Sequence, residues 1–514
     1  MNNTITLTAP ATANANRWMI IVTVMMLAIL EVLDSTIVNV ALPAMMSSLG
    51  ASQGEITWVL TSYVVASAIV LPLTGFLSNV IGRKNFLFIC AAGFMLSSLF
   101  CGISNSLVEM VIFRIIQGAC GSSLIPISQT LLRETFPIEE QGKAMAIWGL
   151  GILAAPVFGP TLGGFITEHT TWRWVFYINL PFCALSLFMI GWVIPKVQAI
   201  KQKIDVLGLI LMIIGIASLQ IMLDKGNDEG WFQSNYILTL AATATFCLTY
   251  LIVRCLKSTS PIIQLKLYTN RNFMLCSLMM LLFCGTIFSF ITLQPIMLEN
   301  YFGYSAIAAG MAMAPLGIAS ATGMLIASRL MYKVKVKYIL MTALMIASIG
   351  MWHQCHASLN ASTSYFIVSN CLIGLGMGFF FVPLSTYVFA TLNNKDIGEA
   401  SGLFSYARML GTSIGVSLIT TLASQVTQIS WHDLTAHITS FNPNVTAWLN
   451  AQNLTSMNAT AVMRLSNAVA TQSGILGFLA AFKTLAIILL LQIPIALSLK
   501  SVKLSSEKAI HADH

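Results

Sequence analysis

Charge is the scarcest property of this 514-residue chain, since only 9% of its residues are Asp, Glu, Lys or Arg. Soluble proteins carry about 25% charged residues, so a soluble globular protein is excluded. The chain is instead 57% hydrophobic, with a mean hydropathy of +0.81. Its long apolar runs predict an all-α polytopic membrane protein.

Several chemistries lack the residues that they need. No Gly-rich loop ends in Gly-Lys-Ser/Thr, so ATP drive is not indicated. None of the ten cysteines has C-x-x-C spacing, and the seven histidines lie at the ends of runs, in loops or in the tail. We therefore expect no metal, no cofactor and no membrane-embedded enzyme. The net charge of +8 is dispersed between the runs, which argues against nucleic acid as a partner, and no filter loop indicates a channel.

Fourteen apolar runs are long enough to cross a bilayer, for which a helix needs about 20 residues. The first run is too long for a cleavable signal sequence, so we expect it to be retained. The fourteen expected spans are 18–42, 56–78, 86–104, 107–132, 143–167, 173–194, 206–223, 236–256, 273–298, 305–330, 338–356, 365–390, 400–425 and 477–498.

The basic residues orient these spans. With the N-terminus inside, twenty Lys and Arg residues fall in inner loops and tails, three fall outside and three lie within the membrane. Because positive residues collect on the cytoplasmic side, both termini are expected to be cytoplasmic.

A faint internal repeat divides the chain. "GFLSNVIGRKNF" (75–86) and "GMLIASRLMYKVK" (323–335) each begin with Gly and end in a basic turn. Repeated halves are the usual plan of secondary transporters. The expected parts are a tail (1–17), a six-helix bundle (18–194), two intervening helices (206–256), a second six-helix bundle (273–498) and a tail (499–514).

The connection 426–476 is polar and rich in Asn, Thr and Ser. It is interpreted as an external loop, whose scattered apolar residues could pack as short helices. Two possibilities remain open: it has no special role, or it is a docking surface for a partner outside the membrane.

Two acids interrupt the first run, "LAILEVLDSTIVNVALP" (27–43). Glu31 and Asp34 share one helix face, which must point to protein or water because a charge at bilayer depth is costly. Arg114 in the fourth span is expected about 10 Å below the outer edge, close to the depth of about 12 Å expected for Asp34. Such groups could bind protons and switch partners, or could form a permanent structural pair.

Small residues and prolines mark the fifth span. Gly159 and Gly163 lie one helical turn apart, which permits close helix packing, and proline bends a helix. The segment "APVFGPTLGG" (155–164) combines both features in Pro156, Gly159, Pro160, Gly163 and Gly164.

Other polar groups within the spans are weaker candidates. Substrate could be bound by Asp34, Gln117, Gln129, Gln294 or Arg408, although the glutamines could equally bond to neighbouring helices. Arg408 and Lys483 could attract an anion, or their heads could extend to the membrane surface. The 27 Met and 28 Phe residues would suit an adaptable apolar pocket.

A set of motifs resembles the major facilitator superfamily, in particular its fourteen-helix drug:proton antiporter branch and the EmrB-type multidrug exporters. The motifs are "LDSTIVNVALP" (33–43), "GFLSNVIGRK" (75–84), "RIIQG" (114–118), "GPTLGG" (159–164), "WRWVFYINLP" (172–181), "IDVLGL" (204–209), "SLQIMLD" (218–224) and "YARMLGTSIG" (406–415).

The resemblance implies roles for these residues. Asp34 would be the first-helix acid of proton coupling, with Arg114 as the fourth-helix motif arginine and Glu31 as an additional acid that the branch does not generally have. A cytoplasmic gating turn would comprise Gly75, Asn79, Gly82, Arg83 and Lys84, although Asn79 replaces the usual acid and so weakens a charge relay. Pro156, Gly159, Pro160, Gly163 and Gly164 would form the antiporter helix.

The resemblance also implies a function. We expect a proton-driven antiporter in the bacterial inner membrane that exports amphipathic drugs or toxic small molecules from the cytoplasm or inner leaflet. Its partners would be a periplasmic membrane-fusion adaptor and an outer-membrane channel. The alternative is a dedicated exporter of one metabolite, such as a siderophore or a toxin.

Overall fold

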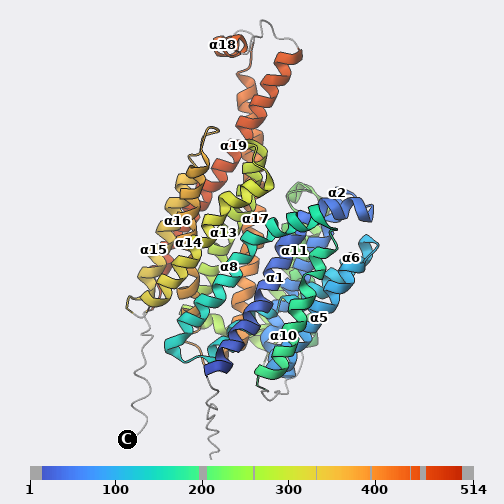
Figure 1. Cartoon of the computed structure of the whole chain (residues 1–514), viewed down its shortest axis with the longest axis vertical. Coiled ribbons are helices and arrows are strands. Elements are labelled where there is room, and N and C mark those ends of the chain that lie inside the picture. Colours follow the sequence, from blue (N-terminus) through green and yellow to red (C-terminus); the bar gives the residue numbers. More distant parts are fainter. Residues whose placement is uncertain are drawn as a thin grey trace, which may run out of the picture.

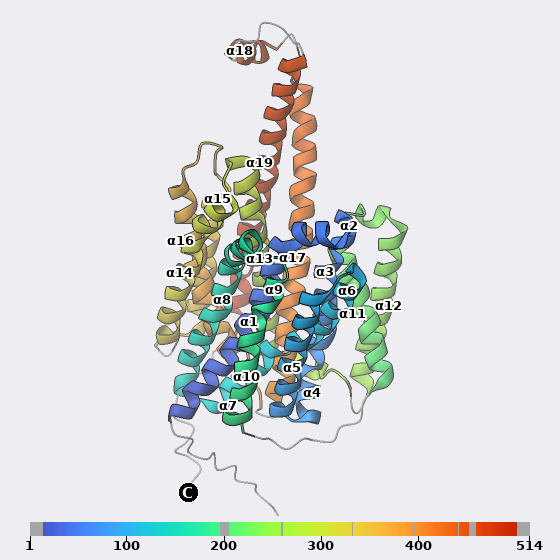
Figure 2. The same ribbon diagram turned by 45° about the vertical axis from the view of Figure 1, so that its right-hand side comes forward.

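The computed structural model describes residues 14–195, 205–258, 261–331, 333–393, 396–439, 442–451 and 459–500. Within these ranges the regular structure is helical (Figures 1 and 2). Most of both expected tails, the inner-loop residues Lys196, Lys201 and Lys203, and Lys395 lie outside the described residues.

The helices fall into an N-terminal half, an intervening pair and a C-terminal half. The N-terminal half comprises α1 (Asn14–Leu49), α2 (Gln53–Ile56), α3 (Trp58–Val70), η1 (Leu71–Leu73), α4 (Thr74–Ile81), α5 (Arg83–Ile103), α6 (Leu107–Gly121), α7 (Leu124–Thr135), α8 (Ile138–His169), α9 (Trp174–Tyr177) and α10 (Asn179–Val193). The intervening part comprises α11 (Val206–Lys225), η2 (Trp231–Gln233), α12 (Asn235–Lys257) and η3 (Leu265–Thr269). The C-terminal half comprises α13 (Arg271–Phe302), α14 (Ala306–Leu330), α15 (Val336–Gln354), α16 (Thr363–Tyr387), α17 (Ile397–Ala436), α18 (Pro443–Ala451), α19 (Ala459–Leu491) and α20 (Ile493–Leu497).

Thirteen helical stretches of the described chain are long and apolar enough to cross a membrane. Helix α8, with 32 residues, is not among them but also exceeds the length of a span. Together they make the fourteen crossings expected from the sequence, and the predicted fold class is confirmed. The division into two six-helix bundles and two intervening helices stays a prediction.

Both described ends of the chain lie at the same end of the molecule, which we call the terminal end. Arg17 on α1 pairs with Glu140 at the start of α8, 3.9 Å away. Near the other end of the described chain, Asn272 donates from Nδ2 to the backbone carbonyl oxygen of Lys500 at 3.2 Å. The hydroxyl of Tyr387 donates to the same carbonyl oxygen. An even number of crossings follows from this arrangement.

Glycines bring the first and fifth long helices of each half into close contact. On α8, a Cβ at Gly159 would overlap the side chain of Thr36 on α1. On α17, a Cβ at Gly411 would overlap the carbonyl oxygen of Leu281, and one at Gly415 would overlap Gly285 of α13. The same packing device therefore recurs in both halves.

Helix α11 is bonded to both halves near one end of the bundle. Toward the N-terminal half, Thr61 donates to Asp224, and Lys225 donates to Thr57. Toward the C-terminal half, Gln220 donates to Ser413 with Nε2 2.8 Å from Oγ. The intervening pair is therefore not a detached addition to the bundle.

The segment 426–476 differs from the expected loop. Helix α17 continues to Ala436 and α19 begins at Ala459, so the two form a helical hairpin that projects beyond the bundle (Figures 1 and 2). Forty residues make α17 about 60 Å long, twice the ~30 Å hydrocarbon core. The short helix α18 lies at the tip, where Leu449 packs with Ala461 and Leu465. We call this projecting part the stalk.

Candidate functional site

The carboxylate of Asp34 is held by three side chains from two other helices. Arg114 of α6 donates from Nη1 to Oδ2 at 2.7 Å. Gln117 of α6 and Asn179 of α10 donate to Oδ1 at 3.0 and 2.8 Å. All four side chains are buried. The structure thus brings together two groups whose expected depths were similar, and surrounds them with amide donors.

Arg114 is also fixed from the side of α3. Its Nε donates to the carbonyl oxygen of Val59 at 3.0 Å, and its guanidinium carbon lies 4.2 Å from the centroid of the Tyr63 ring. Gly118 allows this approach, because a Cβ there would overlap the carbonyl oxygen of Tyr63. The glycine of the "RIIQG" motif therefore positions the arginine. One nitrogen, Nη2, is buried without a hydrogen-bond partner in the described structure.

A serine joins the two amides behind Asp34. Gln117 and Asn179 both donate to Oγ of Ser98 on α5, at 3.2 and 2.9 Å. Ser98 in turn donates to the carbonyl oxygen of Phe176 at 3.1 Å. Removing one partner of a buried ion pair leaves an uncompensated charge and typically costs about 3–5 kcal/mol. This network therefore holds Asp34 in one place as long as the pair remains charged.

Glu31 lies one turn before Asp34 on α1 but has different surroundings. Its Oε2 is buried and has no hydrogen-bond partner among the described residues. The two acids that share a face in the sequence therefore differ: Asp34 is bonded within its own half, and Oε2 of Glu31 has no bonded partner among the described residues.

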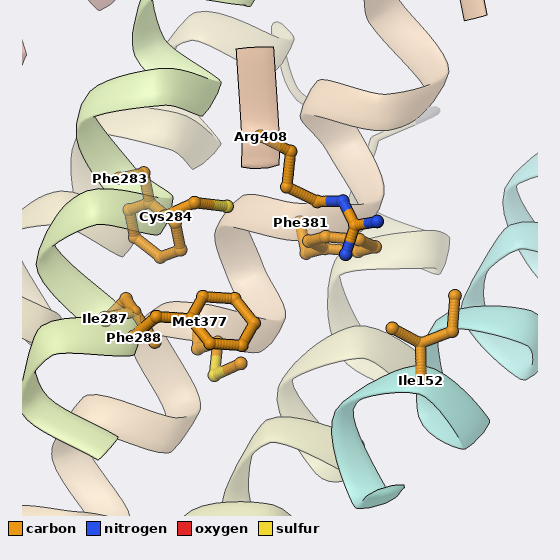
Figure 3. A pocket seen from close by; sticks show the side chains of 8 residues that line it. All are labelled: Ile152, Phe283, Cys284, Ile287, Phe288, Met377, Phe381 and Arg408. Atoms are coloured by element: carbon orange, nitrogen blue, oxygen red, sulfur yellow. The ribbon is translucent and has the colours of Figure 1, made fainter. Parts of the chain in front are cut away.

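Arg408 lines a small apolar pocket between the halves. Figure 3 shows α13 on one side and α8 on the other, with the guanidinium of Arg408 pointing between them beside Phe381. The free space among these side chains is about 10 Å³, room for roughly one water molecule and far below the size of a ligand site. Its lining is Ile152, Phe283, Cys284, Ile287, Phe288, Met377, Phe381 and Arg408.

The predicted gating turn lies at the terminal end, against the C-terminal half. A Cβ at Gly75 would overlap the backbone of Glu399 on α17. Gly82 has a φ of +85°, which favours glycine, and joins α4 to α5. Arg83 forms an ion pair with Glu134 of α7, and Lys84 donates to the carbonyl oxygen of Gly191 at 2.7 Å.

The remaining residue of the turn, Asn79, lies half-buried on α4. The acid that pairs with Arg83 comes from α7 instead of from the turn itself. Glu134 was not predicted from the sequence, although its position directly after Arg133 in a short charged run was an available signal.

Further contacts close the terminal end between the halves. Arg133 donates from Nη2 to the carbonyl oxygen of Thr386 at 3.0 Å, and its guanidinium carbon lies 4.7 Å from the centroid of the Phe389 ring. Ser401 donates to the carbonyl oxygen of Pro126 at 2.9 Å and lies 3.4 Å from Oε1 of Gln129. Gln129 therefore lies at this junction and not in the apolar pocket.

The other candidates are spread over the molecule. Gly159 and Gly163 pack closely against α1. At Gly164 an added Cβ would lie 4.0 Å from Cγ1 of Val40, which is an ordinary contact distance. Pro156 and Pro160 lie within the continuous helix α8, and their side chains lie outside the described ones. Gln294 is buried, with neither amide atom hydrogen-bonded in the described structure.

Asn179, Ser98 and Tyr63 were not singled out from the sequence. Asn179 stands inside "WRWVFYINLP", where a polar residue in an apolar stretch was an available signal. Ser98 and Tyr63 are ordinary residues of membrane helices, and no local signal distinguishes them. Among the described residues, no group of three or more His, Cys, Asp or Glu side chains could hold a metal ion.

Comparison with known proteins gives a consistent result. The profile of a family described as "Major Facilitator Superfamily" matches residues 24–416. "Multidrug export protein EmrB" of Haemophilus influenzae is 35% identical over 457 residues, which cover 87% of this chain and 89% of that protein. "Fatty acid resistance protein FarB" of Neisseria gonorrhoeae is 34% identical, covering 91% and 92%.

Solved structures share the fold at lower identity. The proton:xylose symporter XylE bound to 6-bromo-6-deoxy-D-glucose has a TM-score of 0.61 and 14% identity, covering 96% of this chain and 97% of that one. The human organic anion transporter MFSD10 has the same TM-score and identity, covering 93% and 99%. The expected likeness to EmrB-type proteins is confirmed by the sequence comparisons.

Proposed function

The chain belongs to the Major Facilitator Superfamily, and we propose that it exports drugs or other toxic amphipathic small molecules in exchange for protons. It acts as a transporter and not as an enzyme. Names of relatives support drug export: "Multidrug export protein EmrB" occurs in both Haemophilus influenzae and Escherichia coli.

The buried pair of Asp34 and Arg114 is the observation that carries proton coupling. Asp34 is the carboxylate of this pair, and its Oδ atoms accept from Arg114, Gln117 and Asn179. Protonation of Asp34 would remove the charge that holds Arg114 and would free the three donors. The two protonation states therefore favour different arrangements of α1, α6 and α10, which is what coupling requires.

Alternating access supplies the export step. Contacts between the halves at the terminal end, such as those of Arg133 and Ser401, would open while the opposite end closes. The glycine contacts of α1 with α8 and of α13 with α17 would let helices of each half move as packed units. The proton gradient is the energy source, and no cofactor takes part.

In this proposal the protein lies in the bacterial inner membrane with both termini cytoplasmic. The terminal end is then cytoplasmic and the stalk is periplasmic. A stalk of this length supports docking to a periplasmic membrane-fusion adaptor, which would lead substrate to an outer-membrane channel.

A dedicated exporter of one class of compound is the second candidate function. The relative named "Fatty acid resistance protein FarB" favours it, because that name refers to a single class of amphipathic compound. Transport assays with a panel of chemically unrelated drugs separate the two candidates.

Substrate-induced proton release from the purified protein tests the coupling. We expect release from the wild type when a drug binds, and its loss in Asp34→Asn while drug binding persists. Asp433→Asn, which changes an exposed acid on α17, is the matched control and should behave as wild type. Unchanged release in Asp34→Asn would refute the coupling role of Asp34.

A further inference from the structure

A cavity at the terminal end lies apart from the buried ion pair and from the contacts between the halves. It opens between the start of α1 and the start of α8, and its volume is about 110 Å³. One water molecule occupies about 10–15 Å³ of such a cavity, so a group of several heavy atoms fits, whereas a drug-sized ligand does not. All of its lining residues belong to the N-terminal half, so the cavity does not depend on how the halves meet.

The cavity carries a net positive charge. Arg17 of α1 and Lys143 of α8 line it with two cations, and Glu140 contributes one acid. The acid offsets Arg17 only weakly, because the two side chains are 3.9 Å apart and that of Glu140 is 55% exposed to solvent. Nε of Arg17 is buried and has no hydrogen-bond partner among the described residues. The lining therefore includes a cationic donor that the described residues leave unsatisfied.

Trp18 relates the cavity to the edge of the membrane. Its ring is 47% exposed, and Nζ of Lys143 lies 5.6 Å from the ring centroid, within the range of a cation–π contact. Tryptophan is enriched where the protein passes from water into lipid. One helical turn further into the span, on the same face of α1, Val22 is also 47% exposed. The charged cavity therefore continues into an apolar surface that runs toward the lipid tails.

We propose that this cavity binds the phosphodiester of an anionic phospholipid, with Arg17 and Lys143 as its ligands and with the acyl chains along Trp18 and Val22. A phosphate group has several acceptor oxygens, so it can accept from a guanidinium and from an ammonium at once. Basic pockets between membrane helices on the cytoplasmic side bind such headgroups. In the proposed orientation the lipid comes from the inner leaflet, and its phosphate joins the terminal ends of α1 and α8.

The apolar surface below the cavity favours a lipid over free phosphate. Inorganic phosphate presents the same oxygens, but it would leave the exposed face of Trp18 and Val22 uncovered. A phospholipid covers that face with its tails while its phosphate fills the cavity. The shared chemistry of the two ligands is the phosphate group, and the tails distinguish them.

The net charge of the lining selects the headgroup. Two cations and one acid leave one net positive charge, which the single negative charge of phosphatidylglycerol neutralises. Phosphatidylethanolamine has the same phosphate but adds an ammonium, so it is neutral overall and brings a further cation to the site. Near a membrane surface, the attraction of one such charge corresponds to a preference of about fivefold.

The test is a binding measurement on the delipidated full chain in neutral detergent micelles. The probe is tail-labelled fluorescent phosphatidylglycerol at trace concentration, with phosphatidylethanolamine that carries the same label as the zwitterionic analogue. Fluorescence anisotropy gives the apparent Kd of each lipid. For the wild type we expect phosphatidylglycerol to bind about fivefold more tightly than phosphatidylethanolamine.

Variants of the lining should change this ratio in opposite directions. Arg17→Gln and Lys143→Gln each remove one cation, so the net charge vanishes and the ratio should fall to near unity. Glu140→Gln removes the acid and should raise the ratio above that of the wild type. Arg271→Gln is the matched control, because Arg271 is an exposed arginine at the start of α13 and lies outside the lining. It should keep the wild-type ratio.

Four outcomes would overturn the proposal: a wild type that binds both lipids equally, Arg17→Gln and Lys143→Gln variants that keep the preference, an Arg271→Gln variant that loses it to the same degree, or displacement of the probe by millimolar inorganic phosphate. The last result would assign the cavity to free phosphate instead of a lipid. The measurement uses neither a drug nor a proton gradient. Its failure would therefore leave the proposed export function intact, and a failure of proton coupling would leave the lipid site intact.

Discussion

Asp34 and Asn179 illustrate what could and could not be predicted residue by residue. The depth of a residue in the membrane follows from its position along a span, so Asp34 and Arg114 could be matched from the sequence. The direction in which a side chain points around its helix depends on which helices are neighbours. That information is absent from one sequence, and it decided that Gln117 and Asn179 join Asp34 while Oε2 of Glu31 is left without a hydrogen-bond partner among the described residues.

Asn179→Ala is the residue-scale prediction. The change removes the hydrogen bonds to Asp34 and Ser98, and leaves a charged acceptor with fewer donors. We expect a loss of about 1–3 kcal/mol in the free energy of unfolding, measured as a lower thermal midpoint in detergent. Asn39→Ala, which changes an exposed asparagine on α1, is the control. Equal thermal midpoints for the two variants would show that the hydrogen bonds of Asn179 do not stabilise the fold.

At the scale of elements, the apolar runs predicted where the chain crosses the membrane but not where helices end. Hydropathy identifies the segment that lipid favours, and falls once a helix leaves the bilayer. The polar residues of 426–476 therefore looked like a loop, although α17 and α19 continue as helices and pack on each other at the stalk. Pairing between two helices, which local sequence does not reveal, stabilises such an extension.

Helix contact at Gly411 gives an element-scale prediction. An added Cβ would overlap the carbonyl oxygen of Leu281, so Gly411→Ala must push α17 away from α13. We expect a destabilisation of about 1–3 kcal/mol, as in other overpacked sites, and reduced transport. Gly398→Ala on the same helix is the matched control, since a Cβ there meets no atom within 4 Å. A Gly411→Ala protein as stable as Gly398→Ala would contradict the close packing.

The start of α11 is capped by Asp205, whose carboxylate accepts from the backbone of Gly208 and from Arg254 of α12. The hydrogen bonds from Arg254 lower the pKa of Asp205 below its usual value. Because the folded pKa is lowered, the stabilisation is complete above the ordinary Asp pKa and is lost as the pH falls through the lowered value.

Asp205→Asn should therefore lower the thermal midpoint slightly at neutral pH, because asparagine caps a helix as well as aspartate does and the change removes only the charge that pairs with Arg254. The difference from wild type should shrink as the solution is acidified below the ordinary range of aspartate. A pH series of unfolding curves for the two proteins measures this. A difference that is constant with pH would mean that the charge of Asp205 does not matter.

For the whole molecule, the sequence predicted the class of fold and the number of crossings, because both follow from hydropathy and charge. It did not predict that the N-terminal and C-terminal halves contact each other at the terminal end of the bundle. That depends on surfaces such as Thr74 with Gly402 and Arg133 with Thr386, which come from distant parts of the chain.

A disulfide between the halves tests this contact. A Cβ built on Gly402 lies 3.7 Å from Cβ of Thr74, within the range of about 3.5–4.5 Å found in disulfides. It also lies 2.8 Å from the carbonyl oxygen of Leu71, so the reduced double variant must first be shown to transport like the wild type. Oxidised Thr74→Cys/Gly402→Cys protein should stop transporting and should recover on reduction. The control is Thr74→Cys/Ser123→Cys, which joins residues of one half whose hydroxyls lie 3.0 Å apart and should transport in both states. Transport by the oxidised first variant would mean that the halves need not part there.

The continuous helix α17 makes the stalk a lever arm. The same helix carries Arg408 about 17 Å from its start and extends into the projecting stalk, where α18 lies at the tip (Figure 2). If a helix of about 60 Å tilts by 10° about its first residue, Ile397, its far end moves by about 10 Å, whereas the backbone at Arg408 moves by only about a quarter of that distance. A small rearrangement inside the membrane is thus magnified mechanically into a large stroke at a distance from it.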